Sequence, residues 1–288
     1  MFIFIRNGEI LLKKIGIIPN TKKDKNLSVT KKLIKALKCC MEIYIENLLD
    51  EEISDVCICD DIYEKAECII VLGGDGTILQ AAEKCARKKI PILGVNLGRI
   101  GFMTEIEINE IKEAVDALCK GDYLVENRMM LKISVVSGGK TFEYHALNDV
   151  VIGKTDDAKL IYMNLYSGGD MINKYIADGL IISTPTGSTG YNISAGGPVV
   201  NPLMRLFVAT PICAHMLTAR PVIMPSEEKI EVVLESDGVN DAIVTVDGNV
   251  VGKIGNGDKV IITMSQYTTD IIRIKKESFY NVFTGKLS

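Results

Sequence analysis

The residues with the clearest chemical potential are one aspartate and the glycines around it. Asp75 stands between Gly74 and Gly76, a few residues after an apolar run that ends at Leu72. A strand, a glycine turn and a helix together favour phosphate, because free backbone N–H groups and the helix dipole both attract anions. A phosphate would repel the carboxylate, unless the carboxylate holds a metal ion or accepts a proton from an attacking hydroxyl. We therefore predict that Asp75 is catalytic. The predicted phosphate cradle comprises Gly73, Gly74, Gly76 and Thr77.

A second stretch, from Asp178 to Pro198, is rich in hydroxyl groups and glycine. A predicted strand runs into a turn that starts a short helix near Ser188. Hydroxyls and backbone N–H groups in such a turn bind phosphate, or the polar edges of a sugar and a base. Self-capping explains any single Ser or Thr better, but it does not account for the whole run from Ser183 to Thr189. Tyr191 could supply a stacking face.

Two further polar groups accompany predicted strands. Asn148 and Asp149 precede an apolar run. Either they form an ordinary turn, or the amide and the carboxylate together hold ribose hydroxyls, which need both donors and acceptors. Asp247-Gly248-Asn249 is typical of a hairpin turn.

The predicted secondary structure that positions these residues differs between the two halves of the chain. Up to Lys120, short apolar strands alternate with amphipathic helices, which predicts a doubly wound parallel sheet with ligands at the carboxyl ends of its strands. The expected strands are 15–20, 42–45, 67–72 and 92–96; the expected helices are 28–41, 78–89 and 106–120, with the helix after the glycine turn beginning at Thr77 and residues 50–61 irregular.

Beyond Gly121, runs rich in Val, Ile and Tyr alternate with Gly, Asn or Asp turns, a pattern typical of an antiparallel β-sandwich. The expected strands are 131–136, 141–145, 150–153, 160–166, 172–176, 179–183, 229–234, 242–246, 259–264 and 270–274. We therefore expect an α/β domain over 1–122 and an all-β sandwich domain over 123–274, with the cleft between them as the default ligand site. Residues 1–14 are a candidate extension, and 275–288 are expected to pack back on the first domain.

Composition and motifs exclude several classes. The 288 residues are 47% hydrophobic and carry a net charge of −4, which argues against a nucleic-acid surface. No apolar segment is long enough to span a membrane, so we expect a cytoplasmic protein and no membrane partner. The eight cysteines match no zinc spacing and are expected as free thiols buried like small hydrophobes, with no metal held by the protein. A Walker loop, a G-x-G-x-x-G turn after the first strand and a G-x-S-x-G elbow are all missing from the sequence.

The glycine turn resembles the GGDGT signature shared by NAD kinases, diacylglycerol- and sphingosine-type lipid kinases and, more distantly, 6-phosphofructokinases. Downstream segments resemble NAD kinases specifically, from about Ile15 to the C-terminus. The block Asp178–Pro198 is close to the family's D-G-x-x-x-x-T-P-T-G-S-T-A-Y-x-x-S-x-G-G-P. The other matching segments are Asn96–Phe102, Leu147–Val150, Thr210–His215, Arg220-Pro221 and Ser278–Tyr280.

The resemblance implies ATP-dependent phosphorylation of the adenosine ribose 2′-hydroxyl of NAD, with Mg²⁺ on the ATP phosphates and a homodimer or homotetramer as the assembly. By position, Asp75 corresponds to the proton acceptor, and Asn148 and Asp149 to the dinucleotide-binding pair. Phe102 corresponds to a wall for the adenine. The other implied contacts are Gly76, Lys159, Asp178, Thr189, Gly190, Tyr191, Asn192, Ile193, Ser194 and Asn249.

Three positions depart from the family pattern. Gly190 stands where alanine is commoner, Ile176 where many bacterial members have arginine, and Asn249 where glutamine is frequent. Two alternatives stay open: a lipid kinase that shares the glycine turn, and a non-catalytic NAD(P)-binding sensor on the same fold. The sequence does not decide between ATP and polyphosphate as donor, or between NAD and NADH as acceptor.

Overall fold

The computed structural model of the chain describes residues 12–46, 53–98, 101–155, 159–216, 218–235 and 241–287. The chain divides into two units, each with its own hydrophobic core. Unit 1 comprises the described parts of Met1–Arg128 and Thr268–Ser288, and unit 2 comprises those of Met129–Tyr267. Strands β7 (Leu124–Ser137) and β18 (Lys259–Arg273) each have residues in both units. Residues 1–11 of the candidate extension lie outside the described residues.

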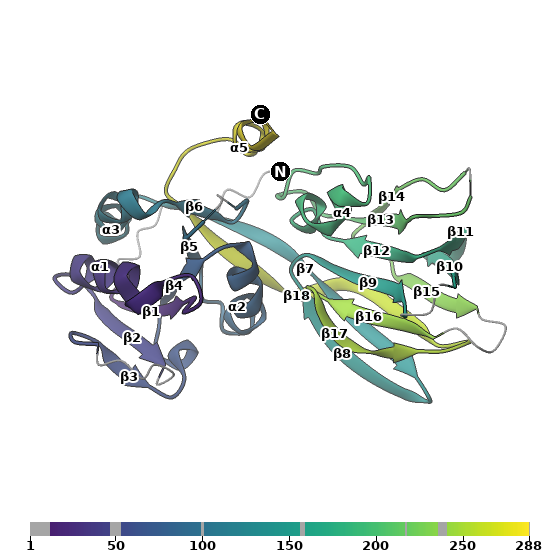
Figure 1. Ribbon diagram of the computed structural model, residues 1–288, viewed down its shortest axis with the longest axis horizontal. Helices are drawn as coiled ribbons and strands as arrows, with labels where there is room; N and C mark the ends of the chain where they lie inside the picture. Colours follow the sequence, from purple (N-terminus) through teal and green to yellow (C-terminus); the bar gives the residue numbers. More distant parts are fainter. Residues whose placement is uncertain are drawn as a thin grey trace. The chain divides into compact units, whose positions relative to one another are not determined.

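Unit 1 is built on a parallel sheet (Figure 1). Its strands follow the order β18–β5–β4–β1–β2–β3, and every neighbouring pair is parallel. A further strand, β6, pairs with β5. All residues of β4 and β5 are buried, as expected for strands covered on both faces. The bounds are β1 (Lys14–Pro19), β2 (Glu42–Glu46), β3 (Cys57–Cys59), β4 (Cys68–Gly73), β5 (Ile92–Asn96) and β6 (Thr104–Ile106).

Helices cover both faces of this sheet. The core on one face joins the apolar sides of α1 (Ser28–Leu37) and α3 (Ile111–Lys120) to alternate residues of the strands, including Leu93 and Val95. The intervening residue, Gly94, faces α2 (Asp75–Lys88), because a Cβ at Gly94 would lie 2.8 Å from Ile78 Cδ1. The doubly wound α/β arrangement is therefore confirmed. The short 3-10 turns η1 (Lys25–Leu27), η2 (Ile62–Glu64) and η3 (Ile108–Glu110) and the C-terminal helix α5 (Phe279–Leu287) complete unit 1.

Three elements of unit 1 differ from expectation. Helix α2 begins at Asp75 rather than Thr77, because Gly74 has extended dihedral angles and serves as the N-cap. Residues 104–106 form β6, so the helix expected from residue 106 begins at Ile111; Ile106 pairs with Val95 and is buried in the sheet. Cys57–Cys59 form an edge strand in the stretch expected to be irregular, and their exposure explains why no alternating apolar pattern marked them.

Unit 2 consists of two antiparallel sheets. The first follows the order β11–β10–β15–β18, with β7 pairing β18 and β8 pairing β7. The second follows β14–β13–β12–β9–β16–β17. The bounds are β8 (Lys140–Ala146), β9 (Asp149–Lys154), β10 (Ile161–Ser167), β11 (Asp170–Ala177), β12 (Gly179–Ser183), β13 (Leu206–Ile212), β14 (Val222–Pro225), β15 (Ile230–Glu235), β16 (Ala242–Val246) and β17 (Asn249–Ile254).

One core contains inward residues of both sheets, which is the packing of a β-sandwich. Met163 and Val232 of the first sheet belong to the same buried cluster as Val150 and Leu180 of the second. The expected sandwich is therefore confirmed. The expectation missed β13, β14 and β17, and it divided the continuous strand β18 into two.

The cysteines only partly match the expectation of buried thiols. All eight lie within the described residues, and all are free. Cys68 and Cys85 are buried, whereas Cys39, Cys40, Cys57 and Cys213 are exposed, and Cys59 and Cys119 are half-buried. The error arose because cysteine at a loop or an edge strand has no apolar neighbours that would require burial. Across the helices that the structure describes, none is long and apolar enough to cross a membrane.

Candidate active site

The glycine turn joins β4 to α2 at the carboxyl end of the strand. A Cβ at Gly73 would lie 2.3 Å from Thr77 Oγ1, so only glycine lets the turn close on this helix. At Gly76, a Cβ would meet no described atom within 4 Å. A ligand can therefore approach the first turn of α2 from the side of Gly76, where free N–H groups and the helix dipole favour an anion.

Thr77 is the member of the predicted cradle that faces inward. It is buried, and its Oγ1 accepts a hydrogen bond from Asn20 Nδ2 at 3.1 Å. Asn20 directly follows β1, so this contact ties α2 to the end of the neighbouring strand. The open part of the cradle is Gly74 to Gly76.

The Asp75 carboxylate is held by the loop after β5. Its Oδ2 accepts a hydrogen bond from Phe102 N at 2.7 Å. Its Oδ1 accepts bonds from Met103 N at 3.1 Å and from Thr104 N at 3.2 Å, with Thr104 Oγ1 at 3.3 Å. Four donors from residues 27 to 29 positions away therefore fix the orientation of the half-buried side chain.

Gly101 makes this contact sterically feasible. A Cβ at Gly101 would lie 1.8 Å from Asp75 Oδ1 and 2.4 Å from Asp75 Cγ. The loop can approach the carboxylate only because this position has no side chain. The sequence marked Gly101 as part of a family motif, but nothing local to it indicated a contact with Asp75.

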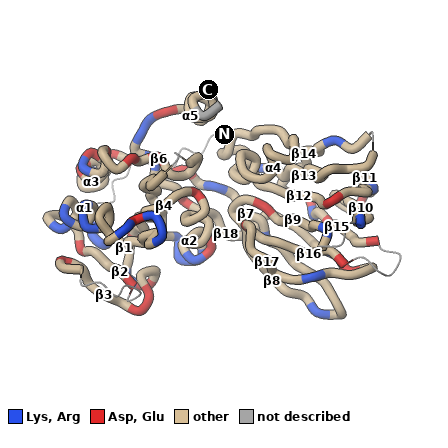
Figure 2. Tube along the Cα trace, in the orientation of Figure 1, with Lys and Arg blue, Asp and Glu red and all other residues tan. Residues whose placement is uncertain are grey.

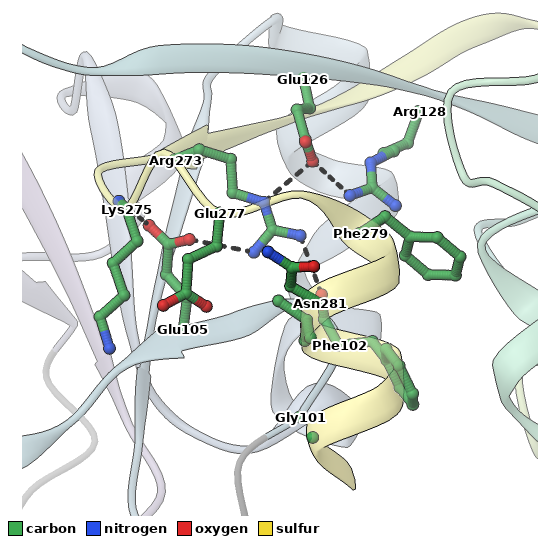
Figure 3. Close-up of a pocket in the computed structure, with 12 residues that line it drawn as sticks. Gly101, Phe102, Glu105, Glu126, Arg128, Arg273, Lys275, Glu277, Phe279 and Asn281 are labelled. Carbon is green, nitrogen blue, oxygen red and sulfur yellow. Dashed lines mark hydrogen bonds and ion pairs between the residues drawn. The ribbon is translucent and has the colours of Figure 1, made fainter. Parts of the chain in front are cut away.

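A buried network of charged side chains also contacts the loop after β5, through the carbonyl oxygen of Phe102 (Figure 3). Arg273 Nη2 donates to Phe102 O at 2.9 Å, and its guanidinium is also paired with Glu126 and Glu105. Glu126 pairs with the buried Arg128 as well. Burial alone would raise the pKa of Glu126, but the two guanidinium groups hold it below its usual value. The network therefore keeps a carboxylate charged inside unit 1 and anchors the residue that donates to Asp75.

This network lines a cavity of about 240 Å³ in unit 1. Phe102 and Phe279 contribute aromatic surface to it, with their ring centroids 6.3 Å apart. The ring centroid of Phe283 lies 6.4 Å from that of Phe102. Phe102 is thus half-buried beside α5, with its backbone on Asp75 and its ring in an aromatic cluster.

Lys23 is a candidate that sequence reasoning missed. Its ammonium lies 3.5 Å from the position that a Cβ would take at Gly74, and 3.8 Å from the corresponding position at Gly98. Figure 2 shows Lys and Arg gathered along α1 and the loop before it. A lysine-rich loop is usually a solvated surface, and only the folded structure places Lys23 beside the glycine turn.

In unit 2, the backbone of Asn148 and Asp149 is held by a second aspartate, Asp247. Asp247 Oδ2 accepts a hydrogen bond from Leu147 N at 2.8 Å, and its Oδ1 accepts from Asn148 N at 2.8 Å and Asp149 N at 3.1 Å. Asp247 occupies the β16–β17 hairpin turn with φ +46°, followed by Gly248 with φ +79°. The hairpin interpretation is confirmed, and the turn also fixes a segment about 100 residues earlier.

The side-chain oxygen of Asn148 lacks a hydrogen-bond donor among the described residues. Asn148 Oδ1 is buried, and no described residue is its hydrogen-bond partner. A buried acceptor without a donor is costly, so a bound donor such as a hydroxyl or an amide would be favoured there. Gly187 and Gly190 pack against the same residue: a Cβ at Gly190 would lie 3.5 Å from Asn148 Nδ2.

Asp149 has a strongly shifted acidity. Burial first, and the nearby charge of Asp247 second, raise its pKa from 3.8 to about 7. The folded chain therefore keeps a proton that the unfolded chain releases near pH 4. It follows that the free energy of unfolding falls as the pH rises from about 4 to about 7, by up to a few kcal/mol.

Asp149→Asn is expected to remove this pH dependence. The melting temperature of the variant should vary less between pH 5 and pH 8 than that of the wild type, and the variant should gain stability relative to it as the pH rises. Asp170→Asn changes the exposed first residue of β11 in the same unit and serves as the control. Calorimetry measures the melting temperature at each pH. If it changed with pH equally in the wild type and in Asp149→Asn, the raised pKa of Asp149 would be contradicted.

Much of the hydroxyl-rich block supports the fold itself. Thr184 Oγ1 donates to Leu147 O at 2.6 Å, and Ser188 Oγ donates to Pro185 O at 2.7 Å. Asn192 is fully buried; its Nδ2 donates to Ser188 O and Pro198 O, and its Oδ1 accepts from Thr210 Oγ1. The hydroxyls of Thr184 and Ser188 and the side chain of Asn192 therefore have internal partners, and a ligand-binding role for the run as a whole stays a prediction.

The remaining sequence-predicted residues of unit 2 lie nearer the surface. Asp178 follows β11 and pairs with Lys154 at 2.7 Å. The commoner alanine would be a tight fit at Gly190, since a Cβ there would lie 3.3 Å from the backbone oxygen of Gly187. Exposed side chains belong to Lys159, Tyr191, Ser194 and Asn249, and half-buried positions to Thr189 and Ile193.

Two family descriptions match nearly the whole chain. The ATP-NAD kinase N-terminal domain matches residues 15–123, and the ATP-NAD kinase C-terminal domain matches residues 147–274. The chain belongs to the NAD kinase family. As a member of the NAD kinase family it is a phosphotransferase, and the lipid-kinase alternative is not favoured.

Named relatives agree with this family. The chain is 40% identical to the NAD kinase of Thermoanaerobacter sp. (strain X514) over 285 residues, which cover 96% of this chain and 99% of the relative. It is also 40% identical to the NAD kinase of Lachnoclostridium phytofermentans over 284 residues, with the same coverage.

Solved NAD kinase structures are similar in fold. An NAD kinase from Archaeoglobus fulgidus in complex with ATP has a TM-score of 0.73 at 27% identity, covering 95% of this chain and 98% of that one. Yeast NADH kinase complexed with NADH has a TM-score of 0.86 at 22% identity, covering 97% of this chain and 88% of that one.

Proposed function

We propose that the chain transfers the terminal phosphoryl group of ATP to the 2′-hydroxyl of the adenosine ribose of NAD, giving NADP. The observation that carries this proposal is the Asp75 carboxylate, which lies at the start of the helix that follows the glycine turn. It accepts hydrogen bonds from three backbone N–H groups, those of residues 102–104. A carboxylate in that position suits a hydroxyl acceptor beside a phosphate donor. Family membership supplies the substrates.

Asp75 aligns the attacking hydroxyl and accepts its proton late in the transfer. Its Oδ2 accepts a single described hydrogen bond, from Phe102 N, and a carboxylate oxygen has two acceptor positions. Oδ2 therefore keeps capacity for the ribose hydroxyl. Phosphoryl transfer proceeds through a loose transition state, so alignment and charge neutralisation supply most of the acceleration.

The first turn of α2 binds the phosphates of ATP. Gly74 and Gly76 leave space for the close approach of an oxygen, and Lys23 supplies a positive charge beside them. The described residues contain no group of three or more His, Cys, Asp or Glu that could hold a metal ion. As the family resemblance implies, Mg²⁺ would enter with ATP as part of the substrate, and it would neutralise phosphate charge.

Unit 2 binds NAD. The unsatisfied Oδ1 of Asn148 accepts a hydrogen bond from the dinucleotide, and Asp149 beside it accepts a second one. Tyr191 offers an exposed ring for stacking. Phe102 is a separate proposed contact, which the family resemblance assigns to the adenine. The other proposed contacts are Gly76, Lys159, Asp178, Thr189, Gly190, Ile193, Ser194, Asn249 and the backbone of Asn192.

A coupled assay for NADP formation tests the proposal. Purified protein is incubated with Mg²⁺ and either ATP or polyphosphate, with NAD, NADH or diacylglycerol as acceptor. NADP formed from ATP and NAD is the expected product. Phosphorylated lipid would support the lipid-kinase alternative, and binding of NAD without any product would support a non-catalytic sensor.

Lys23→Gln is expected to raise the KM for ATP by about tenfold, with little change in the KM for NAD. The ammonium is replaced by a neutral group of similar length, and a partly exposed charge contact with phosphate contributes on the order of 1 kcal/mol. Lys22→Gln is the matched control, since it removes the same charge from the preceding exposed position. Initial-rate kinetics with each substrate varied separately give both constants; equal effects of the two substitutions would contradict the role of Lys23.

We also propose a homodimer or homotetramer, as the family resemblance implies, and a cytoplasmic location, as predicted from the sequence. Sedimentation velocity of the purified chain measures the assembly. A monomer at micromolar concentration would contradict it.

A further inference from the structure

Two cysteines that lie far apart in the sequence meet in unit 1. Cys40 follows α1, and Cys119 lies in the last turn of α3, 79 positions later. Their sulfur atoms are 2.7 Å apart. All eight cysteines fall within the described parts of the chain, and of these this is the pair whose sulfurs are in contact. A disulfide bond is about 2.05 Å long, so a small displacement would join them.

The two thiols have different environments. Cys40 is exposed to solvent, whereas Cys119 is half-buried against the core of unit 1. Burial first, and the contact with Cys40 second, raise the pKa of the Cys119 thiol to about 12. Cys119 therefore keeps its proton and donates an S–H hydrogen bond to Cys40 Sγ. Cys40 is the sulfur that a reagent in solution can reach.

We propose that Cys40 and Cys119 form a thiol–disulfide exchange site that reacts with low-molecular-weight disulfides such as oxidised glutathione. The Cys40 thiolate attacks one sulfur of the reagent, forming a mixed disulfide and releasing one glutathione thiolate, which takes up a proton. Cys119 then loses its proton and attacks the Cys40 sulfur, releasing the second glutathione. In total, two cysteine thiols are oxidised to one disulfide, and one reagent disulfide is reduced to two thiols.

The neighbouring cysteines show why this pair is selected. Cys39 is also exposed, but the contact with Cys119 is made by Cys40. Cys68 and Cys85 are buried, where a reagent cannot reach them. A mixed disulfide formed at Cys40 has a second thiol already in place, so the intramolecular step would be favoured over further reaction with glutathione.

The crosslink would enclose most of unit 1. The closed segment from residue 40 to residue 119 contains β4, the glycine turn and α2, and therefore Asp75. Closing a long segment restricts the unfolded chain, which stabilises the folded state. Oxidation should therefore make the unit that carries the catalytic carboxylate more resistant to unfolding.

Peptide mapping of the full chain tests the proposal. The reduced protein is treated with oxidised glutathione, alkylated and digested without reductant, and the linked peptides are sequenced by tandem mass spectrometry. A Cys40–Cys119 link that dithiothreitol reverses is the expected product. It should be lost in Cys40→Ser and Cys119→Ser and kept in Cys39→Ser, the matched control.

Thermal unfolding supplies a second measurement. The oxidised wild type should melt several degrees above the reduced wild type, and Cys40→Ser should show no such increase. Differential alkylation of wild-type protein gives the same information without any substitution, should a variant fail to fold. The proposal would be overturned by mixed glutathione disulfides without a crosslink, by a Cys39–Cys119 link, or by failure of both thiols to react.

Discussion

Asp75→Asn is expected to lower kcat for NADP formation by about 10²–10⁴-fold or more, with NAD still bound. The amide cannot accept the proton of the ribose hydroxyl. It also places an NH₂ group where the wild-type carboxylate receives N–H donors from the loop at residues 102–104. The loss should therefore appear in turnover rather than in NAD affinity, which calorimetry measures separately.

Glu83→Gln is the matched control for this substitution. Glu83 lies on the same helix and makes an exposed i,i+4 pair with Arg87, an interaction that contributes little. Its turnover should remain close to that of the wild type. If Asp75→Asn kept near-normal turnover, the assignment of the proton acceptor would be wrong.

Gly101→Ala is expected to reduce turnover by about 10²-fold through the position of Asp75 alone. A Cβ at this residue would meet Asp75 Oδ1 at 1.8 Å and Thr104 Oγ1 at 2.6 Å, so the loop and the carboxylate must separate. Misplacement of a catalytic group by about 1 Å can cost this much activity. The substituted residue itself carries no chemical group, so the loss would show that the loop controls the carboxylate.

Gly98→Ala provides the comparison within the same loop. The nearest described atom to a Cβ at Gly98 is Lys23 Nζ at 3.8 Å, which is ordinary contact with the end of a flexible side chain. Turnover should change by no more than a few-fold. Similar kinetics for the two alanine variants would indicate that the loop does not hold Asp75 in the active protein.

Local chemistry in the sequence was enough to locate the glycine turn. An apolar strand, three glycines and a helix specify a helix N-terminus at the carboxyl end of a buried strand, and the structure confirms that placement. The alternation of Val, Ile and Tyr runs likewise specified a sandwich, because side-chain alternation is a property of the strand itself.

The partners of the site residues were beyond prediction because they come from distant parts of the chain. Asp75 is held by residues from the loop after β5, and Asp247 holds residues about 100 positions earlier. Lys23 looks in sequence like any other lysine of its loop. Such contacts depend on how strands are ordered in a sheet, which composition and periodicity do not encode.

The path of β18 has a consequence for the order in which the protein can fold. Ile271 pairs with Ile92 of β5, and Arg273, the next residue but one, anchors Phe102 through its guanidinium. Both residues belong to the last 21 residues assigned to unit 1, Thr268–Ser288, which the ribosome makes after all of unit 2. Until β18 has been made, Ile92 of β5 would lack its partner Ile271. The loop that donates to Asp75 would also lack the hydrogen bond from Arg273 to Phe102 O. The Asp75 carboxylate would therefore reach its final geometry only after Arg273 has been made.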